Sequence, residues 1–311
     1  VNITPSYSGA DVNNYSVTDQ STTTANITTK ALTATASASN KTYDGGTTAS
    51  TTLTFTGLVG SETLGQTVGS TFDNKNVGSN KTVTVNSITL ANGSNGGLAA
   101  NYSISAGQTT TANITPKALT VSGITASNKM YDGNTVATLS SSNVTYSGIV
   151  SGDSFAGSFS GSFSDKNIGT GKTVTITSSY SGSDVSNYTV TDQSSTTANI
   201  TSRDLEVTGI TVFGLTVNNK EYDGTVTAPL KTDNISYSGL VEGDDFTGSY
   251  SGVFANANVG NGKTVTITSS YSGADAGNYT VTNQSSATGN IVPKVLTATA
   301  STSNKTYDGG T

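Results

Sequence analysis

The sequence contains no cysteine, no histidine and no tryptophan, and only one methionine and four prolines in 311 residues. Without Cys and His, the chain cannot form disulfides, a zinc finger, a thiol nucleophile or a His general base. Charged residues make up 11% of the chain, against about 25% in an ordinary globular protein. Runs of the residues that favour long helices are absent as well.

The formal net charge is −6, and no basic stripe is present. A phosphate backbone would be repelled, so we expect no nucleic-acid partner. No stretch approaches the roughly 20 apolar residues of a membrane helix, and we expect no membrane span in this segment. A chain poor in Cys, Met and charge but rich in Thr, Ser, Gly and Asn suits an extracellular location.

Apolar residues are few, at 32%, but they favour strands. In 172–177, Val and Ile alternate with Thr, which is the period-two pattern of a half-buried strand. Turn clusters such as 132–134 and 151–153 separate such segments. Six or seven strands at regular spacing predict an all-β sandwich in each repeat.

The strongest signal is an internal repeat. Tyr-Asp-Gly recurs at spacings of 88, 91 and 85 residues, beginning at Tyr43, Tyr131, Tyr222 and Tyr307. A period of about 87 residues exceeds a solenoid coil and matches one whole β-sandwich domain. In addition, residues 1–47 are identical to 265–311 at 34 of 47 positions.

The repeat predicts domain boundaries. Residues 30–116, 117–202 and 203–293 are three complete repeats, 1–29 is the C-terminal part of another, and 294–311 is the N-terminal part of a further one. No Gly/Ser-rich or Pro-rich linker separates them, so we expect little hinge freedom and an extended, semi-rigid rod. Since neither end can complete a sandwich, we expect the natural chain to continue in both directions. The third repeat carries extra residues, in which we expect Phe213 or Leu215 to cover a junction.

Tyr-Asp-Gly is predicted to be a structural turn. Asp-Gly suits a tight hairpin, because Gly accepts positive φ and Asp can bond its own backbone. The Tyr ring would then pack on the edge of its own sandwich. A ligand site built on Tyr and Asp is the alternative. The predicted turn residues are Tyr43, Asp44, Gly45, Tyr131, Asp132, Gly133, Tyr222, Asp223, Gly224, Tyr307, Asp308 and Gly309.

A second pattern places Asp four residues before a Tyr that leads into an alternating strand. It is similar to the tyrosine corner of immunoglobulin-like sandwiches, in which the Tyr hydroxyl bonds to the local backbone. The predicted corner residues are Asp11, Tyr15, Tyr102, Asp184, Tyr188, Asp275 and Tyr279. Leu98 replaces the Asp before Tyr102, which weakens any metal-binding role for that Asp.

We expect no cofactor and no metal site. Calcium is the open alternative, because it stiffens the joints of many sandwich arrays, but it needs six to eight oxygen ligands. Acidic residues here mostly stand singly, apart from 242–245, and the predicted junctions carry Lys or Arg. No catalytic residues are predicted either, since no nucleophile elbow or recurring base is present.

Together, NKxYDG, the turn at 146–153, xKNxG-KTVT and SGADAGNYTVT resemble the YDG and MBG repeat domains of large bacterial surface proteins. These include filamentous-haemagglutinin-like adhesins of two-partner secretion systems. The resemblance implies a secreted or surface-anchored filament on the bacterial cell surface. We therefore expect a tandem array of immunoglobulin-like β-sandwich domains that forms the stalk or fibre of an adhesin, with a role in adhesion or biofilm.

Two other functions remain open: a self-assembling matrix filament, and a glycan- or surface-binding module. The expected partners are neighbouring repeats of the same chain, with other copies of the filament as an alternative. A cell-surface or glycan target would lie elsewhere in the parent protein.

Overall fold

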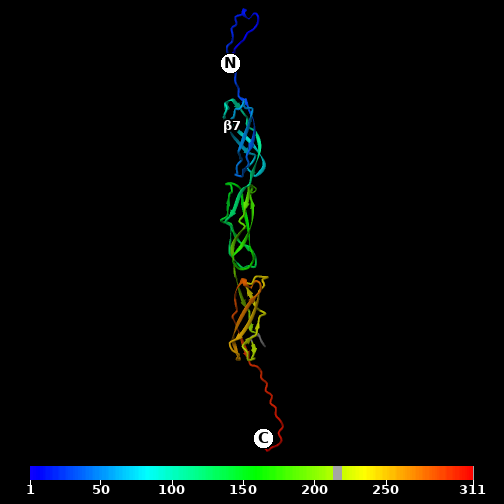
Figure 1. The fold of residues 1–311 in the computed structure, drawn as a ribbon. Helices are drawn as coiled ribbons and strands as arrows, with labels where there is room; N and C mark the ends of the chain where they lie inside the picture. Colours follow the sequence, from blue (N-terminus) through cyan, green and yellow to red (C-terminus); the bar gives the residue numbers. More distant parts are fainter. Residues whose placement is uncertain (213–218, 311) are drawn as a thin grey trace. The chain divides into compact units, whose positions relative to one another are not determined.

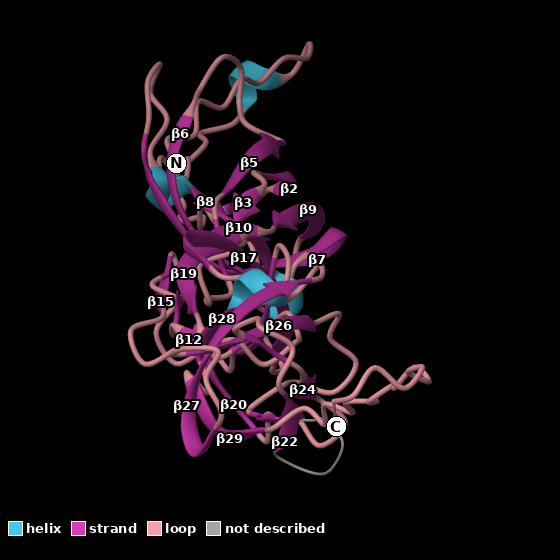
Figure 2. Cartoon of the chain, turned by 90° about the horizontal axis from the view of Figure 1, so that it is seen from below, coloured by secondary structure: helices cyan, strands magenta, loops and turns pink. Residues whose placement is uncertain are grey.

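The computed structural model describes residues 1–212 and 219–310. Most of these residues form strands joined by turns (Figures 1 and 2). No α-helix occurs among the described residues, and the helical segments in Figure 2 are 3-10 helices. The predicted all-β fold class is confirmed. Short 3-10 helices are the other regular elements: η1 (Val12–Asn14), η2 (Ala99–Asn101), η3 (Val185–Asn187) and η4 (Ala276–Asn278). The predicted roles of Phe213 and Leu215 lie outside the described residues.

The chain divides into two compact units, each made of segments that are distant in sequence. Unit 1 comprises 1–121, 146–157 and 180–191. Unit 2 comprises 122–145, 158–179 and 192–311. The first predicted repeat lies wholly in unit 1 and the third wholly in unit 2, while the second contributes segments to both. The two joints between repeats that are described below each lie inside one unit.

In the first repeat, a five-stranded sheet has the order β3-β9-β7-β6-β4, and two smaller pairings are β1-β8 and β2-β5. Strands β3 and β9 are parallel, whereas β9, β7, β6 and β4 pair antiparallel. The strands are β1 (Lys30–Ala31), β2 (Thr33–Ala38), β3 (Lys41–Thr42), β4 (Thr48–Ala49), β5 (Thr51–Thr56), β6 (Leu64–Phe72), β7 (Gly78–Asn92), β8 (Tyr102–Ser103) and β9 (Thr109–Thr115).

The third repeat follows the same plan. Its five-stranded sheet is β22-β29-β27-β26-β23, its three-stranded sheet is β25-β20-β28, and β21 pairs with β24. The strands are β20 (Arg203–Thr208), β21 (Thr211–Val212), β22 (Asn219–Glu221), β23 (Thr227–Ala228), β24 (Leu230–Lys231), β25 (Ser236–Ser238), β26 (Thr247–Phe254), β27 (Gly260–Ser272), β28 (Tyr279–Thr282) and β29 (Ser286–Val292).

The strands of the second repeat form the sheets β12-β19-β17-β16-β13, β15-β10-β18 and β11-β14. They are β10 (Lys117–Ser122), β11 (Thr125–Ala126), β12 (Lys129–Met130), β13 (Val136–Ala137), β14 (Leu139–Ser140), β15 (Thr145–Ser147), β16 (Ala156–Phe163), β17 (Gly169–Ser181), β18 (Tyr188–Thr191) and β19 (Ser195–Thr201).

Alternating side chains explain why these segments are strands. In β7 and β27, buried Val83, Val85, Val265 and Ile267 alternate with Thr side chains that stay at least partly exposed. Burying one face and solvating the other fixes the register, because a slip of one residue would exchange the two faces. Each of these strands also contains a register shift near its start, between Gly78 and Lys81 in β7.

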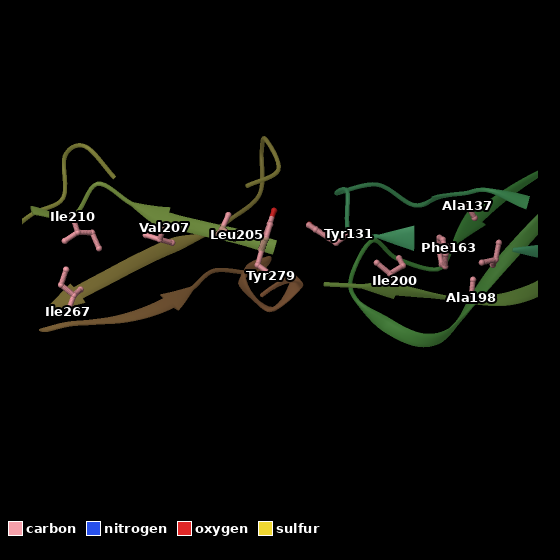
Figure 3. Packing of buried hydrophobic residues seen from close by; sticks show 11 residues of the cluster. Tyr131, Ala137, Phe163, Ala198, Ile200, Leu205, Val207, Ile210, Ile267 and Tyr279 are labelled. Carbon is pink, nitrogen blue, oxygen red and sulfur yellow. The ribbon is translucent and has the colours of Figure 1, made fainter. Parts of the chain in front are cut away.

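A buried cluster in unit 2 joins side chains from two predicted repeats (Figure 3). Leu205, Val207, Ile210, Ile267 and Tyr279 come from the third repeat. The second repeat contributes Tyr131, Ala137, Phe163, Val174, Ala198 and Ile200. In Figure 3, Tyr131 and Tyr279 lie between these two groups of side chains. The second and third repeats are therefore in direct contact through buried side chains.

The terminal segments differ from the repeats. Residues 1–29 contain η1 and an isolated bridge between Asn2 and Thr22, and nearly all their side chains are exposed. No strand occurs within 294–310. In the part of the chain that is described, no helix has the length and apolar content needed to cross a membrane.

Candidate functional site: joints between successive repeats

The Tyr-Asp-Gly segment makes a turn, but not the expected hairpin. The Asp44 carboxylate accepts hydrogen bonds from the Gly46 N–H at 2.9 Å and the Lys41 ammonium at 2.7 Å, and Gly45 has a φ of +80°. The flanking strands β3 and β4 lie at opposite edges of one five-stranded sheet, so the turn does not join paired strands. The hairpin prediction was wrong because β3 pairs in parallel with β9, the last strand of the same repeat.

The same turn occurs in the other copies. Asp132 accepts from the Asn134 N–H and pairs with Lys129, and Asp223 accepts from the Thr225 N–H. The ion pair with Lys220 is the main cause that lowers the pKa of Asp223 to about 2.

The tyrosine of this turn leaves its own repeat and enters the next one. Tyr43 and Tyr131 are only 1% and 0% exposed. The Tyr43 hydroxyl donates to the Asp153 carboxylate at 2.8 Å, and the Tyr131 hydroxyl donates to Asp244 at 2.8 Å. The Tyr131 ring shares a buried cluster with Phe163 and Ile200 of its own repeat, but the prediction of a sandwich-edge ring did not include a hydroxyl that bonds to the next repeat. Each hydroxyl finds a carboxylate 110 or 113 residues further along the chain.

The same carboxylates receive a second tyrosine, from the predicted tyrosine corner. The Tyr188 hydroxyl donates to Asp153 and the Tyr279 hydroxyl to Asp244, both at 2.5 Å. Each hydroxyl also accepts a backbone N–H, that of Val150 or Val241, which lies 38 residues upstream rather than in the local chain. The paired rings meet edge to face, with centroids 5.5 Å apart in both joints.

Burial is the main cause that raises the pKa of Tyr131, Tyr188 and Tyr279 to about 12, and hydrogen bonding to the aspartate adds to it. The pKa of Tyr43 is raised for the same two reasons. These hydroxyls therefore stay protonated and act as donors at neutral pH.

A lysine completes the arrangement. The Lys75 ammonium contacts Asp153 at 3.0 Å and Asp184 at 2.7 Å, and Lys166 contacts Asp244 at 3.1 Å and Asp275 at 2.7 Å. These two carboxylates raise the pKa of each lysine well above its usual range. In turn, the lysine is the first cause that lowers the pKa of Asp184 and Asp275.

Burial by itself would raise the pKa of Asp153. Hydrogen bonds from Tyr188, Lys75 and Tyr43 outweigh that effect and leave the pKa below its usual value. The carboxylate thus stays ionised although its side chain is nearly buried, because two tyrosines and a lysine donate hydrogen bonds to it.

Two further contacts fix the alignment of the repeats. The Asn187 side chain accepts the Val77 N–H at 2.9 Å, and Asn278 accepts the Ile168 N–H at 3.0 Å. Gly45 and Gly133 allow close approach, because a Cβ at either would lie 2.7 or 2.8 Å from a methyl group of Val150 or Val241.

These residues define two complementary faces. The tyrosine face is Tyr43, Gly45, Lys75, Asn76 and Val77 in the first repeat, and Tyr131, Gly133, Lys166, Asn167 and Ile168 in the second. The acid face is Val150, Asp153, Asp184, Asn187 and Tyr188 in the second repeat, and Val241, Asp244, Asp275, Asn278 and Tyr279 in the third. The joint of the first and second repeats lies within unit 1, and that of the second and third within unit 2.

The remaining predicted residues have other surroundings. Tyr102 donates to Glu62 at 2.5 Å and accepts the Val59 N–H, inside the first repeat. Tyr222 is 41% exposed, and Tyr15 and Tyr307 are mostly exposed. Asp11 is exposed on the loop before η1, and the Asp308 turn repeats the Lys pairing through Lys305. Gly224 and Gly309 keep the positive φ of the turn.

The polar groups of each joint bond to one another, since the tyrosine hydroxyls and the lysine ammonium donate to the carboxylates. Among the described residues, no group of three or more Asp or Glu side chains is arranged to hold a metal ion.

The predicted site residues did not include Lys75, Lys166, Asp153 and Asp244, although these lie in segments that recur between repeats. The available signal was their recurrence: Lys75 and Lys166 each precede a repeat that carries an aspartate at the position of Asp184 or Asp275.

Comparison with known proteins identifies the repeat. A model of the YDG domain matches residues 28–112, 115–198 and 207–288. No curated protein and no solved structure matches the chain. The three matches cover most of the sequence, and the Tyr-Asp-Gly turn recurs in each, so the chain belongs to the YDG domain family and carries three tandem copies of that domain.

Proposed function

We propose that this chain is a load-transmitting segment of a stalk or fibre, in which immunoglobulin-like β-sandwich domains follow one another as an extended rod. The observation that carries the proposal is the joint, which is built alike twice. In each, a buried Tyr and a Lys from one repeat meet two Asp side chains and a second Tyr of the next.

Short connections support the same proposal. Pro116 alone separates β9 from β10, and Ser202 alone separates β19 from β20. A one-residue connection allows little hinge motion, and the polar contacts of the joint restrict what remains. A set of groups that are buried and mutually satisfied specifies one geometry better than an apolar contact of the same size.

The biological setting is proposed on composition and family. A YDG array without cysteine suits a large secreted or surface-attached bacterial protein, for which repeats supply reach and cohesion in adhesion or biofilm. A secretion route of the two-partner type belongs to the same proposal.

Small-angle scattering of the whole chain tests the rod. Strands of 6–10 residues plus loops give roughly 35–45 Å per repeat, so three repeats in line span on the order of 110–130 Å. The maximum dimension should reach at least that value and stay independent of protein concentration. A compact particle would contradict the rod, and growth with concentration would instead favour a self-assembling filament.

A matched variant sharpens this experiment. Changing Lys75→Ala and Lys166→Ala removes both joint cations and leaves the sheets untouched. We expect the scattering of this variant to show a broader range of dimensions. Lys41→Ala and Lys129→Ala remove two lysines from the adjacent turns and serve as the control. If both pairs behave like the parent, the joints do not set the geometry.

A further inference from the structure

Two faces of the kind seen in the joints remain without a partner among the described residues. The third repeat carries a tyrosine face, made of Tyr222, Gly224, Ala257, Asn258 and Val259. The first repeat carries an acid face, made of Val59, Glu62, Leu98, Asn101 and Tyr102. Tyr222 is 41% exposed, whereas its counterparts inside joints are 1% and 0% exposed. Val59, Leu98 and Asn101 are exposed as well.

Each of these two faces differs from the corresponding joint faces at the position of a charged residue. Ala257 stands where the joints have Lys75 and Lys166, so this tyrosine face lacks the lysine that bridges the two carboxylates. The nearby Lys263 ammonium donates to the backbone oxygen of Asn258 at 2.6 Å and so lies within the third repeat. Leu98 stands where they have Asp184 and Asp275, so this acid face has one carboxylate, Glu62, instead of two. Leu98 is thus a larger, apolar side chain at an aspartate position, and Ala257 is a smaller, apolar side chain at a lysine position.

We propose that the tyrosine face of the third repeat binds the acid face of a repeat of the first type, meaning a repeat with Glu and Leu at the positions of Glu62 and Leu98. YDG joints would then be of two kinds, one charged and one apolar, each with its own matching pair of faces. In the apolar joint, Leu98 packs into the space that the lysine stem takes in the charged joint, against Ala257. Glu62 receives both tyrosine hydroxyls, as Asp153 does. Tyr102 already donates to it at 2.5 Å.

Mismatched pairs would be penalised. Ala257 opposite an acid face of the second or third type would leave two nearly buried carboxylates without a cation, and an unpaired buried charge is strongly destabilising. A lysine opposite Leu98 would lose one of its two carboxylates and would lie against an apolar side chain. Such penalties discriminate between partners as much as favourable contacts do.

The sequence identifies the occupant. Residues 294–311, which directly follow the third repeat, match 30–47 at 16 of 18 positions, since only Ala31/Val295 and Ala38/Thr302 differ. The segment after the third repeat thus opens as a repeat of the first type, whose acid face is the one with Glu62 and Leu98.

The inference rests on the proposed array, and its test separates the two. The whole chain is extended after position 311 by a copy of residues 48–116, so that 294–311 and the addition together make a repeat of the first type. Nitration of each tyrosine by tetranitromethane is followed by peptide mass spectrometry. We expect Tyr222 to react about tenfold more slowly in the extended chain, because a closed joint leaves its exposed state a minor population.

Charge exchange tests the matching itself. Leu98→Asp in the added copy should restore fast nitration of Tyr222, and so should Ala257→Lys alone. Both changes together rebuild a lysine–aspartate pair and should restore protection. Rescue would also show that neither Leu98→Asp nor Ala257→Lys prevents the repeats from folding when both are present.

The outcomes are distinct. If Tyr43 and Tyr131 are protected but Tyr222 reacts equally in both chains, or if the double variant is not rescued, the two-kind inference is wrong and the array proposal stands. If Tyr43 and Tyr131 react as fast as Tyr222, the joints themselves are absent and the array proposal fails.

Discussion

A nearly buried aspartate in each joint accepts hydrogen bonds from two tyrosines and one lysine that lie far apart in the sequence. Asp153 accepts from Tyr43, Tyr188 and Lys75, and Asp244 accepts from the equivalent residues. A buried carboxylate is costly unless it is compensated, so the loss of any one donor should weaken the joint. We therefore expect the tyrosines of the joints to contribute more to stability than exposed tyrosines elsewhere in the chain.

Substitution of Tyr131→Phe tests the role of one hydroxyl. The ring and its packing remain, but Asp244 loses one donor, which should cost about 1–2 kcal/mol of unfolding free energy. Urea denaturation followed by circular dichroism measures the change. The control is Tyr222→Phe, at the same position of the turn in the same unit. Since Tyr222 is partly exposed, its change should stay within about 0.5 kcal/mol. Equal effects at both positions would contradict the assigned role.

The raised tyrosine pKa values predict a loss of stability in alkali. These tyrosines have a pKa of about 12 in the folded state, against a usual value of about 10. Each protonated hydroxyl therefore makes its full contribution to the stability of the folded state below pH 10. That contribution is lost as the pH rises from about 10 through 12. The ultraviolet absorbance of tyrosinate should show a late phase near pH 12 in native buffer. In urea it should be replaced by a phase near pH 10, and its absence from native buffer would argue against buried hydroxyls.

At the scale of elements, the Tyr-Asp-Gly turn connects the sheet of one repeat to the next repeat through the hydrogen bond of its tyrosine. The turn directly follows β3 or β12, short edge strands that are held in parallel by the last strand of the same repeat. Its tyrosine therefore emerges where that repeat ends, beside the acid face of the next. The positive φ of the glycine directs the chain away, and the missing side chain makes room for a valine.

Replacing the turn glycine by alanine separates these two effects. Gly133 and Gly224 share a φ of +80°, so either change to Ala should cost about 1–2 kcal/mol in backbone strain. Only at Gly133 would the new Cβ meet Val241, at 2.8 Å from a stiff β-branched methyl group. We expect Gly133→Ala to lower stability by about 1–3 kcal/mol more than Gly224→Ala, measured by urea denaturation. A smaller loss at Gly133 than at Gly224 would show that the valine does not pack there.

Local sequence predicted the elements but not their partners. Alternation in 172–177 predicted a strand that forms part of β17, and the spacing of Tyr-Asp-Gly predicted the repeat. The hairpin could not be excluded from the sequence, because Asp-Gly suits several turns and the parallel pairing of β3 depends on β9, more than 70 residues away. Likewise, Asp153 is 110 residues from Tyr43, and no local pattern links a turn in one repeat to a loop in the next.

At the scale of the whole molecule, cohesion between repeats should not depend on metal. In each joint one lysine bridges the two carboxylates, and two tyrosine hydroxyls donate to one of them, so we expect a chelator to remove nothing that holds the joint. We expect excess EDTA to leave the melting temperature of the whole chain nearly unchanged. A fall of more than about 10 °C corresponds to a loss of about 1–2 kcal/mol for a domain of this size, and would instead support joints held by calcium.

The Lys75→Ala and Lys166→Ala double variant gives this measurement an internal control, because it creates the situation that the parent avoids. Two carboxylates then face each other in each joint without a cation, and like charges at short range repel strongly when nearly buried. Its melting temperature should be lower than that of the parent, and added calcium should raise it. The parent should not respond to calcium. If calcium raises the melting temperature of the parent as much as that of the variant, then the lysine does not take the role of a cation between the carboxylates, and the joints are not held by the lysine–aspartate contacts.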